Sequence, residues 1–304
     1  MKKKAEGSLL DVGGHELHMT NIDKVFWPKE GYKKGDLLLY HHEIAPYMLP
    51  YLKNRPIMLH RFPGGVGEEG FYQKDMAREH LPDWVETFPI QHEERLVNYL
   101  LIPDEATLLF AINLGSVDLH PFHSQIKDPE HPDYIVLDFD PKEIDFRHVV
   151  EAARLTHEIL EDWGIESFCK TSGGRGLHIY IPLQQHFTYD EAKIIAETVA
   201  LTVHQQLPNT TTVERKADKK RGKVFLDFLR NNWTQTVVAP YTVRPREGAT
   251  VSTPLDWKEV TTKLNPQKFT IKTLPGRLKE VGDLFKPVLG KAKVRELKKI
   301  IRGG

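Results

Sequence analysis

The chain has 304 residues, of which 40% are hydrophobic and 28% charged, and its 42 basic and 42 acidic residues give a formal net charge of +0. This length supports one large α/β domain or two smaller ones. The neutral balance is not that of a typical nucleic-acid-binding protein, which is basic overall. The longest apolar runs, at 37–39 and 99–102, are too short to cross a bilayer. The N-terminus lacks the apolar core of a signal peptide, so we expect a cytoplasmic location.

The single cysteine, Cys169, excludes an internal disulfide and a zinc cluster built on several cysteines. Its ordinary interpretation is a small buried hydrophobic side chain. Lysine and arginine gather locally at 2–4, 33–34 and 214–223. Such runs are most often solvated loops, although clustered cations can also form a binding groove on a neutral protein.

The first predicted helix, GDLLLYHHEIAPYMLPYL at 35–52, contains Pro46. Because proline removes a helix hydrogen bond, we expect the helix to be interrupted there. Two later helices are predicted from their N-terminal capping signals, one from Asp145 to Gly164 and one opened by Thr188 and Glu191 that reaches Leu207. Short apolar strands are predicted at 134–140, 167–171, 177–183 and 223–229.

The order strand–helix–strand–turn–strand–helix–strand predicts an α+β fold in which helices cover one face of a largely antiparallel sheet. We expect a single domain in three parts. These are an N-terminal αβ module over about 1–130, a catalytic module over about 131–250 and a C-terminal segment over about 251–304 that wraps the core.

Two carboxylates, Asp138 and Asp140, interrupt the apolar strand YIVLDFDP. Side chains two apart on a strand share a face, and two ionised carboxylates that close repel each other unless a cation lies between them. Asp227 stands in a second apolar strand, KVFLDFL. Three such groups suit hard divalent ions, Mn²⁺ or Mg²⁺, and we interpret them as a two-metal phosphoryl-transfer site. For the D-x-D pair alone, the alternative is helix capping or binding of loop amides.

A glycine-rich turn in KTSGGRGLHIY carries Lys170, Ser172, Arg175 and His178. Glycines let backbone amides approach an anion, and the side chains add charge-assisted donors for phosphate. The glycine spacing fits neither a Walker loop nor a dinucleotide fingerprint. A tight hairpin with incidental polar residues is the alternative.

Two further pairs of polar residues have the chemistry of a substrate site. Arg244 and Arg246 in YTVRPRE suit bidentate contacts to phosphate. His120 and His123 in DLHPFHS are zinc ligands by type. Without a third His or Cys at helical spacing, and with hard carboxylates nearby, we favour contact with substrate over metal binding.

The motifs DFD, SGGRGLH and LDF followed by RPR resemble, in this order, the three catalytic motifs of the archaeo-eukaryotic primase superfamily. More closely, the chain resembles the polymerase domain of the bacterial end-joining ligase D and its stand-alone bacterial and archaeal relatives. The likeness runs nearly from end to end, through 20–52, 55–75, 113–124 and 240–249. It implies a primase-polymerase fold with an RRM-like, mostly antiparallel catalytic sheet.

The resemblance implies that Asp138, Asp140 and Asp227 hold two catalytic metal ions. It implies that His120 contacts the nucleotide and, with Ser172, favours a ribose 2′-OH. The residues expected to hold the incoming nucleotide, mainly through its triphosphate, are Lys170, Ser172, Arg175, His178, Arg244 and Arg246. Arg175 stands where the family often has lysine.

For DNA, Lys24 and Lys34 match a pair that grips the 5′-phosphate downstream of a gap; without the resemblance they would be two exposed lysines. Phe71 and Tyr72 match an aromatic pair that packs on template bases, a contact that tolerates any base sequence. The basic segment 216–223 would correspond to a mobile loop that brings DNA ends together.

The implied activity is template-directed extension of a primer at gaps or broken ends, with ribonucleotides preferred, in non-homologous end joining. Its partners would be 5′-phosphorylated DNA, NTP or dNTP, Ku and a separate DNA ligase, in a nucleoid-associated location. The K-x-D-G tetrapeptide of a ligase does not occur, so ligation would come from another polypeptide. The alternatives are a DNA primase, a non-catalytic DNA-end-binding module and a metal-dependent phosphohydrolase.

Overall fold

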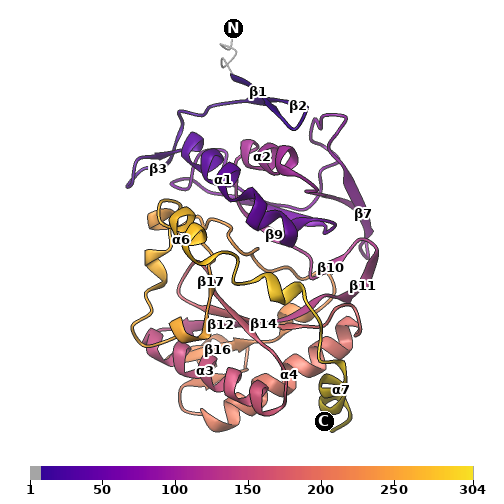
Figure 1. The fold of residues 1–304 in the computed structure, drawn as a ribbon, viewed down its shortest axis with the longest axis vertical. Coiled ribbons are helices and arrows are strands. Elements are labelled where there is room, and N and C mark those ends of the chain that lie inside the picture. Colours follow the sequence, from indigo (N-terminus) through magenta and orange to yellow (C-terminus); the bar gives the residue numbers. More distant parts are fainter. Residues whose placement is uncertain (1–7, 304) are drawn as a thin grey trace.

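The larger of two main sheets has six strands and lies in the lower half of the molecule in Figure 1. The computed structural model describes residues 8–303, so the basic run at 2–4 lies outside the described residues. Every pairing in this sheet is antiparallel except the one between its first two strands. In spatial order the strands are β15 (Thr211–Thr212), β16 (Lys223–Asp227), β12 (Tyr134–Lys142), β14 (Leu177–Pro182), β13 (Phe168–Thr171) and β17 (Pro254–Leu255).

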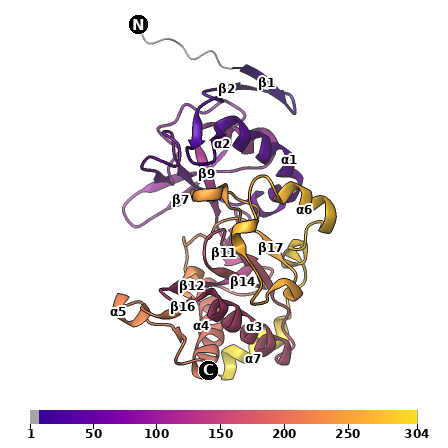
Figure 2. The ribbon, with the colours of Figure 1, turned by 90° about the vertical axis from the view of Figure 1, so that its left-hand side faces the viewer.

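Two long helices, α3 (Phe146–Asp162) and α4 (Tyr189–Gln206), cover one face of this sheet (Figure 2). Along the chain β12, α3, β13, β14, α4 and β16 form a β-α-β-β-α-β unit, and its strands lie in the order fourth, first, third, second. The predicted α+β class and the RRM-like sheet are therefore confirmed. The capping signals also act as predicted: Asp145 accepts a hydrogen bond from the Arg147 amide (2.8 Å), and Thr188 accepts one from the Glu191 amide (3.3 Å).

Alternation along β12 decides which of its side chains are buried under the helices. Ile135, Leu137 and Phe139 belong to the core cluster that includes the inner faces of α3 and α4. Asp138 and Asp140 fall between them in the sequence and therefore point to the opposite face. Cys169 on β13 is fully buried in the same core, as its ordinary interpretation predicts, and burial raises the pKa of its thiol.

The N-terminal region builds the second main sheet, whose strand β5 (Ile57–Arg61) pairs with three neighbours. Helices α1 (Lys34–Leu52) and α2 (Glu105–Asn113) pack on each other and on β9. The other strands are β6 (Phe71–Gln73), β7 (Thr87–Gln91), β8 (Leu96–Leu100) and β9 (Ser116–Pro121). Separate hairpins are formed by β1 (Ser8–Val12) with β2 (His15–Met19), β3 (Val25–Trp27) with β4 (Tyr32–Lys33), and β10 (Ser124–Gln125) with β11 (Asp128–Pro132).

The expected interruption of the first helix is wrong. Helix α1 runs without a break through Pro46 and Pro50. A proline inside a helix costs about 3 kcal/mol, whereas each fully buried large apolar side chain contributes about 1.5–3 kcal/mol. Ile44, Met48 and Leu52 are all fully buried around the prolines, so packing outweighs the lost backbone hydrogen bonds.

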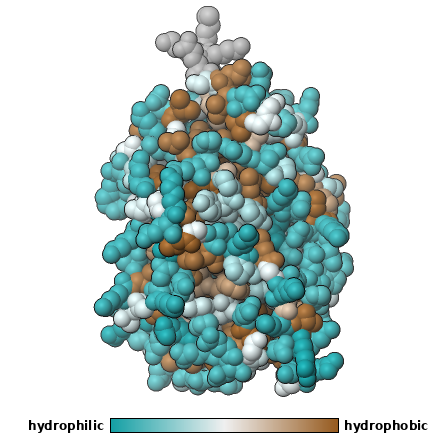
Figure 3. All heavy atoms as spheres, viewed as in Figure 1, coloured by the Kyte–Doolittle hydropathy of each residue, from teal (hydrophilic) through white to brown (hydrophobic). Residues whose placement is uncertain are grey.

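The C-terminal segment runs back along both regions (Figure 1). It supplies strand β17 to the larger sheet, α6 (Leu274–Val281) against α1, and α7 (Val294–Gly303) against α4. The division at about 130 and 250 stays a prediction. No helix within residues 8–303 combines the length and hydropathy that a bilayer crossing needs, and hydrophilic side chains dominate the face in Figure 3, with apolar groups in small patches.

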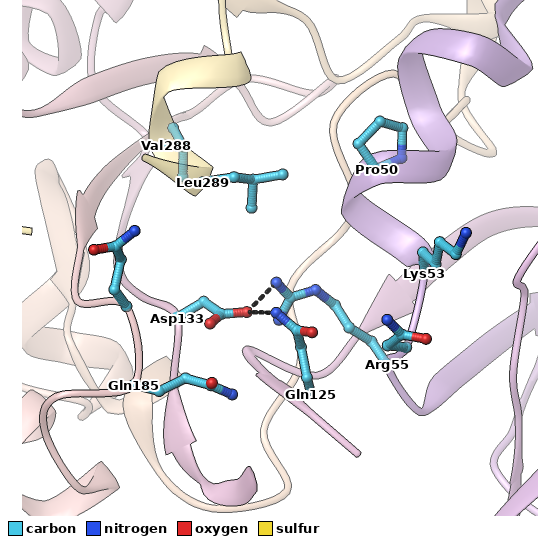
Figure 4. Close-up of a pocket in the computed structure, with 10 residues that line it drawn as sticks. Pro50, Lys53, Arg55, Gln125, Asp133, Gln185, Val288 and Leu289 are labelled. Atoms are coloured by element: carbon cyan, nitrogen blue, oxygen red, sulfur yellow. Dashed lines mark hydrogen bonds and ion pairs between the residues drawn. The ribbon is translucent and has the colours of Figure 1, made fainter. Parts of the chain in front are cut away.

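A buried ion pair joins the segment after α1 to the start of β12, beside a hollow of about 510 Å³ (Figure 4). Arg55 is 1% exposed, and its guanidinium donates to the Asp133 carboxylate and to the His123 carbonyl oxygen (2.7 Å). Gln125 Nε2 also donates to Asp133 (2.8 Å). This pair ties the N-terminal region to the strand that carries Asp138.

We predict that Asp133→Asn destabilises the chain by about 3–5 kcal/mol, because it leaves the buried Arg55 charge uncompensated. The double variant Arg55→Met/Asp133→Leu removes both charges and is expected to lose much less. Urea unfolding measures both free energies. An equal loss in the single and double variants would show that the charge pairing is not what the single variant breaks.

Candidate active site

Four polar side chains form a row across the larger sheet, on the face turned away from α3 and α4. Asp138 on β12 lies directly opposite Asp227 on β16 and opposite His178 on β14. His178 lies in turn opposite Lys170 on β13. Asp140 is two residues beyond Asp138 and shares its face. The register thus brings the three carboxylates together.

Asp138 is the central carboxylate of the row and is held ionised by its neighbours. Its carboxylate lies 3.3 Å from His178 Nε2 and 3.6 Å from Arg230 Nε. Burial alone would raise the pKa of Asp138, but His178, Arg230 and Lys170 together lower it to about 2. Burial lowers the pKa of His178 to about 4, so its imidazole is neutral at pH 7. Lys170 Nζ lies 2.9 Å from His178 Nδ1, the ring nitrogen that does not face Asp138.

Arg230, which no sequence motif indicated, lies between two of the carboxylates. Its Nε is 3.3 Å from Asp227 and 3.6 Å from Asp138. Burial raises the pKa of Asp227, Arg230 opposes that shift and the Asp138 charge adds to it. The signal that could have revealed Arg230 is its position three residues after Asp227, which brings it back beside that carboxylate in a helical turn.

Asp140 lies nearer the rim, where Lys142 Nζ contacts its carboxylate at 2.6 Å. Each of the three carboxylates therefore lies at ion-pair distance from a cationic side chain, either Arg230 or Lys142. Hard oxygen donors on one face of two adjacent strands are what Mg²⁺ and Mn²⁺ prefer. These three side chains fit divalent ions by donor type, and the flexible cations beside them can move away.

The glycine turn is built around Ser172, whose Oγ accepts hydrogen bonds from the amides of Gly174 and Gly176 (both 3.1 Å). These two amides are thus used inside the turn and are not free to bind an anion. Gly173 has φ +69°, a conformation that favours glycine. A Cβ on Gly176 would overlap the carbonyl oxygen of Phe139 on β12. The glycines therefore let the turn sit directly against the strand of the carboxylates.

We predict that Gly176→Ala displaces this turn and destabilises the chain by about 1–3 kcal/mol, the usual cost of overpacking. Gly276→Ala is the matched control, because a Cβ at Gly276 in α6 meets nothing within 4 Å. The control is expected to be neutral or slightly stabilising. Equal unfolding free energies for the two variants, in urea, would contradict the close approach.

A cavity of about 500 Å³ opens over Asp138 and Asp140, whereas Asp227 is not among its lining residues. Burial, Arg244 and Arg175 lower the pKa of Arg246, which shows that positive charge converges at this wall. Arg244 also donates to the Ser172 carbonyl oxygen at 3.3 Å. The predicted residues that line the cavity are Tyr72, His120, Asp138, Asp140, Ser172, His178, Arg244 and Arg246.

Other predicted residues lie elsewhere. Lys170 is fully buried behind His178. Arg175 faces a second hollow, of about 680 Å³, beside the basic segment with its short helix α5 (Ala217–Lys220). His123 is buried against Tyr134. It does not join the group of potential metal ligands found within residues 8–303, which is His60, Asp118 and His120.

The two predicted stacking residues, Phe71 and Tyr72, are adjacent on β6 and so point to opposite faces. Tyr72 lines the cavity and stacks on His60, with ring centroids 4.0 Å apart. Phe71 lies under the guanidinium of Arg61 at 5.4 Å. They do not form one continuous stacking surface.

Lys34 is buried, so the alternative that Lys24 and Lys34 are simply two exposed lysines is wrong for Lys34. Its Nζ donates to the Thr20 carbonyl oxygen (2.6 Å) and to Asn113 Oδ1 (2.8 Å), and Lys24 Nζ donates to the Pro63 carbonyl oxygen (2.6 Å). Burial, then Lys24 and Arg61, lower the pKa of Lys34 to about 8. Within residues 8–303 no carboxylate lies at ion-pair distance from either lysine, so neither charge is neutralised by a neighbouring acidic side chain.

A sequence model of the LigD primase-polymerase domain matches residues 33–285. The chain belongs to this family. The LigD primase-polymerase fold is also that of a solved structure, the polymerase domain from Mycobacterium tuberculosis ligase D in complex with DNA. It superimposes with a TM-score of 0.85 at 28% identity, covering 91% of this chain and 99% of the other.

Two curated relatives are named as end-joining proteins. The bifunctional non-homologous end joining protein LigD of Bacillus subtilis is 35% identical over 89% of this chain, and the multifunctional LigD of Mycolicibacterium smegmatis is 32% identical over 90%. The chain covers 44% and 36% of their respective lengths. The chain therefore corresponds to less than half of either relative. The resemblance that the sequence motifs indicated is confirmed for the LigD primase-polymerase domain.

Proposed function

We propose that the chain is a template-directed nucleotidyltransferase that extends a primer 3′-OH at short gaps and broken DNA ends in non-homologous end joining. The observation that carries the proposal is the group of three carboxylates on β12 and β16. Asp138 and Asp140 line a cavity that Arg244 and Arg246 also line, and Asp227 lies directly opposite Asp138. Carboxylates for metal ions and arginines for a polyphosphate are the two parts that phosphoryl transfer requires.

In this proposal Asp138, Asp140 and Asp227 hold two divalent ions, Mn²⁺ or Mg²⁺. Bound there, the ions lower the pKa of the primer 3′-OH and neutralise charge on the transferring phosphoryl group. Arg244 and Arg246 bind and orient the triphosphate. His178, fixed from behind by Lys170, presents a neutral imidazole beside Asp138. His120 and Ser172 lie at the same cavity and would contact the ribose, with ribonucleotides preferred.

The DNA would be recognised by residues of the N-terminal region and by a basic hollow of the catalytic region. Lys24 and Lys34 carry charge that no nearby carboxylate neutralises within residues 8–303, which suits a 5′-phosphate. Phe71 and Tyr72 would contact template bases from opposite faces of β6. Arg175 and the segment 216–223 add a basic hollow next to the carboxylates, suited to a DNA strand.

The partners that follow are DNA ends with 5′-phosphates, NTP or dNTP, Ku and a DNA ligase, in a nucleoid-associated cytoplasmic location. End joining enters the proposal through the names of the B. subtilis and M. smegmatis relatives. The solved relative is in complex with DNA, which supports the same assignment.

We predict that Asp138→Ala abolishes templated addition to a primer on a gapped, 5′-phosphorylated duplex with NTP and Mn²⁺, by at least about 10³-fold. The variant is expected to retain DNA binding. Asp145→Ala is the matched control: it removes a carboxylate that caps α3 away from the cavity and is expected to cost only about 1 kcal/mol of stability.

Primer extension followed on a denaturing gel measures this loss. Unimpaired extension by Asp138→Ala would contradict the site assignment. DNA binding without any addition by the parent chain would instead favour an end-binding module.

We predict that the preference for a 5′-phosphate over a 5′-hydroxyl falls as the pH rises from 7 to 9. Lys34 is charged below its pKa of about 8 and loses its proton above it. The phosphate is already doubly charged in this range, because its second pKa is about 6. Fluorescence anisotropy of the two gapped duplexes should show a decline approaching about tenfold per pH unit.

Lys34→Arg is the control for this titration, because an arginine stays charged throughout. Its preference is expected to be flat over the same pH range. A flat preference in the parent chain would contradict the role of Lys34 in phosphate binding.

A further inference from the structure

Asp118 is a fully buried carboxylate behind two side chains that line the nucleotide cavity, His120 and Arg244, and the proposed chemistry gives it no role. It lies on β9, opposite His60 on β5 and two residues before His120, so the three side chains meet on one face. A buried carboxylate is costly unless it is paired. Asp118 therefore fixes the positions of the side chains that pair with it.

Three side chains from three separate segments converge on Asp118. His60 Nδ1 lies 2.7 Å from Oδ1, His120 Nε2 lies 3.4 Å from Oδ2, and Arg244 Nε lies 3.1 Å from Oδ2. Burial alone would raise the pKa of Asp118, but His120, His60 and Arg244 hold it well below its usual range. Asp118 thus stays ionised at the centre of the group.

Each of the three side chains connects Asp118 with the cavity, either directly or through Tyr72. His120 and Arg244 line the cavity directly. His60 stacks on Tyr72, and Tyr72 lines the cavity and also meets His120 edge-on, with ring centroids 5.6 Å apart. Because Asp118 holds Arg244 through Nε, the terminal nitrogens of the guanidinium remain for other partners, one of which is the Ser172 carbonyl oxygen.

Two imidazoles and a carboxylate are also ligand types that zinc takes, and their ligand atoms lie within 4.8 Å of one another. The Arg244 guanidinium argues against a metal ion at this place. It already supplies a positive charge 3.1 Å from the single carboxylate. A dication added there would leave buried positive charge uncompensated.

We propose that Asp118 is a positioning residue of the nucleotide site, which sets His120, Arg244 and, through His60, Tyr72 in the arrangement that receives a nucleoside triphosphate. The inference rests on the proposed function for the identity of the ligand. The ionised carboxylate places its two oxygens at ion-pair distance from all three neighbours, although none of these contacts has hydrogen-bond geometry in the structure. An amide of the same shape carries no charge for Arg244, and its NH₂ group donates and would face either an imidazole N–H or the Arg244 N–H.

The test is Asp118→Asn in the full chain, with two readouts. The first is primer extension on the gapped duplex, analysed as KM for NTP and kcat. The second is calorimetric binding of an ATP analogue with a methylene group between the α and β phosphorus atoms, in Mn²⁺, which reports even if no extension occurs. Asp283→Asn is the matched control, because Asp283 is a partly buried carboxylate that accepts from Tyr51 (2.8 Å) and Tyr241 and does not line the cavity.

Asp118→Asn is expected to weaken analogue binding and to raise KM by about 10- to 100-fold, with kcat at saturating NTP within about threefold of the parent. Asp283→Asn is expected to change neither. Parent-like binding and KM in Asp118→Asn, or equal effects in the two variants, would overturn the proposal. So would stoichiometric zinc in the parent that is lost from Asp118→Asn. If the parent binds the analogue but does not extend a primer, the proposed function fails while the binding comparison still decides the role of Asp118.

Discussion

The arrangement of the site depends on one constraint, the register that places Asp138 directly opposite Asp227. Like charges on facing strand positions destabilise a sheet, and the helices on the other face leave these carboxylates only one side on which to point. Arg230 between them and His178 beside Asp138 compensate for the repulsion. Burial raises the pKa of Asp227, Arg230 opposes that shift, and the Asp138 charge adds to it. Divalent ions would relieve the same repulsion.

The cavity lies where the N-terminal region meets the face of the larger sheet that carries this row, and Val136 and Tyr180 on that face share one core cluster with the N-terminal region. The larger sheet contributes the carboxylates, and the N-terminal sheet contributes His120 and Tyr72 on β9 and β6. The segment that carries Arg244 and Arg246 runs between them, and the Trp27 indole donates to the Arg246 carbonyl oxygen at 2.8 Å. Arg55 and Asp133 fasten the start of β12 to the N-terminal region. Small relative movements of the two regions would therefore change the shape of this cavity directly.

Local rules predicted the elements well because the deciding interactions are local. The caps at Asp145 and Thr188, the alternation of YIVLDFD and the glycine turn all act within a few residues. The unbroken α1 could not be predicted in this way. Its prolines are tolerated because of packing with elements far along the chain.

The site residues also fall into two groups, those that local sequence rules predict and those that only the fold reveals. Asp138 and Asp140 share a face by strand periodicity alone, but only the fold shows that Lys170 stands behind His178 or that Lys34 is buried. Adjacent positions on a strand already separate Phe71 from Tyr72, a signal present in the sequence once β6 is assigned. Asp118 precedes His120 by two residues, yet its importance appears only when β5 and the Arg244 segment are placed beside it.

The burial of Cys169 has a practical consequence. The chain has a single thiol, and it is enclosed in the core with a raised pKa, so it is scarcely present as the reactive thiolate. The native sequence is therefore a suitable background for site-selective labelling. A cysteine introduced on the surface near the basic hollow would accept a fluorophore without prior removal of Cys169, and movement of segment 216–223 against the rest of the chain could be followed by energy transfer to labelled DNA.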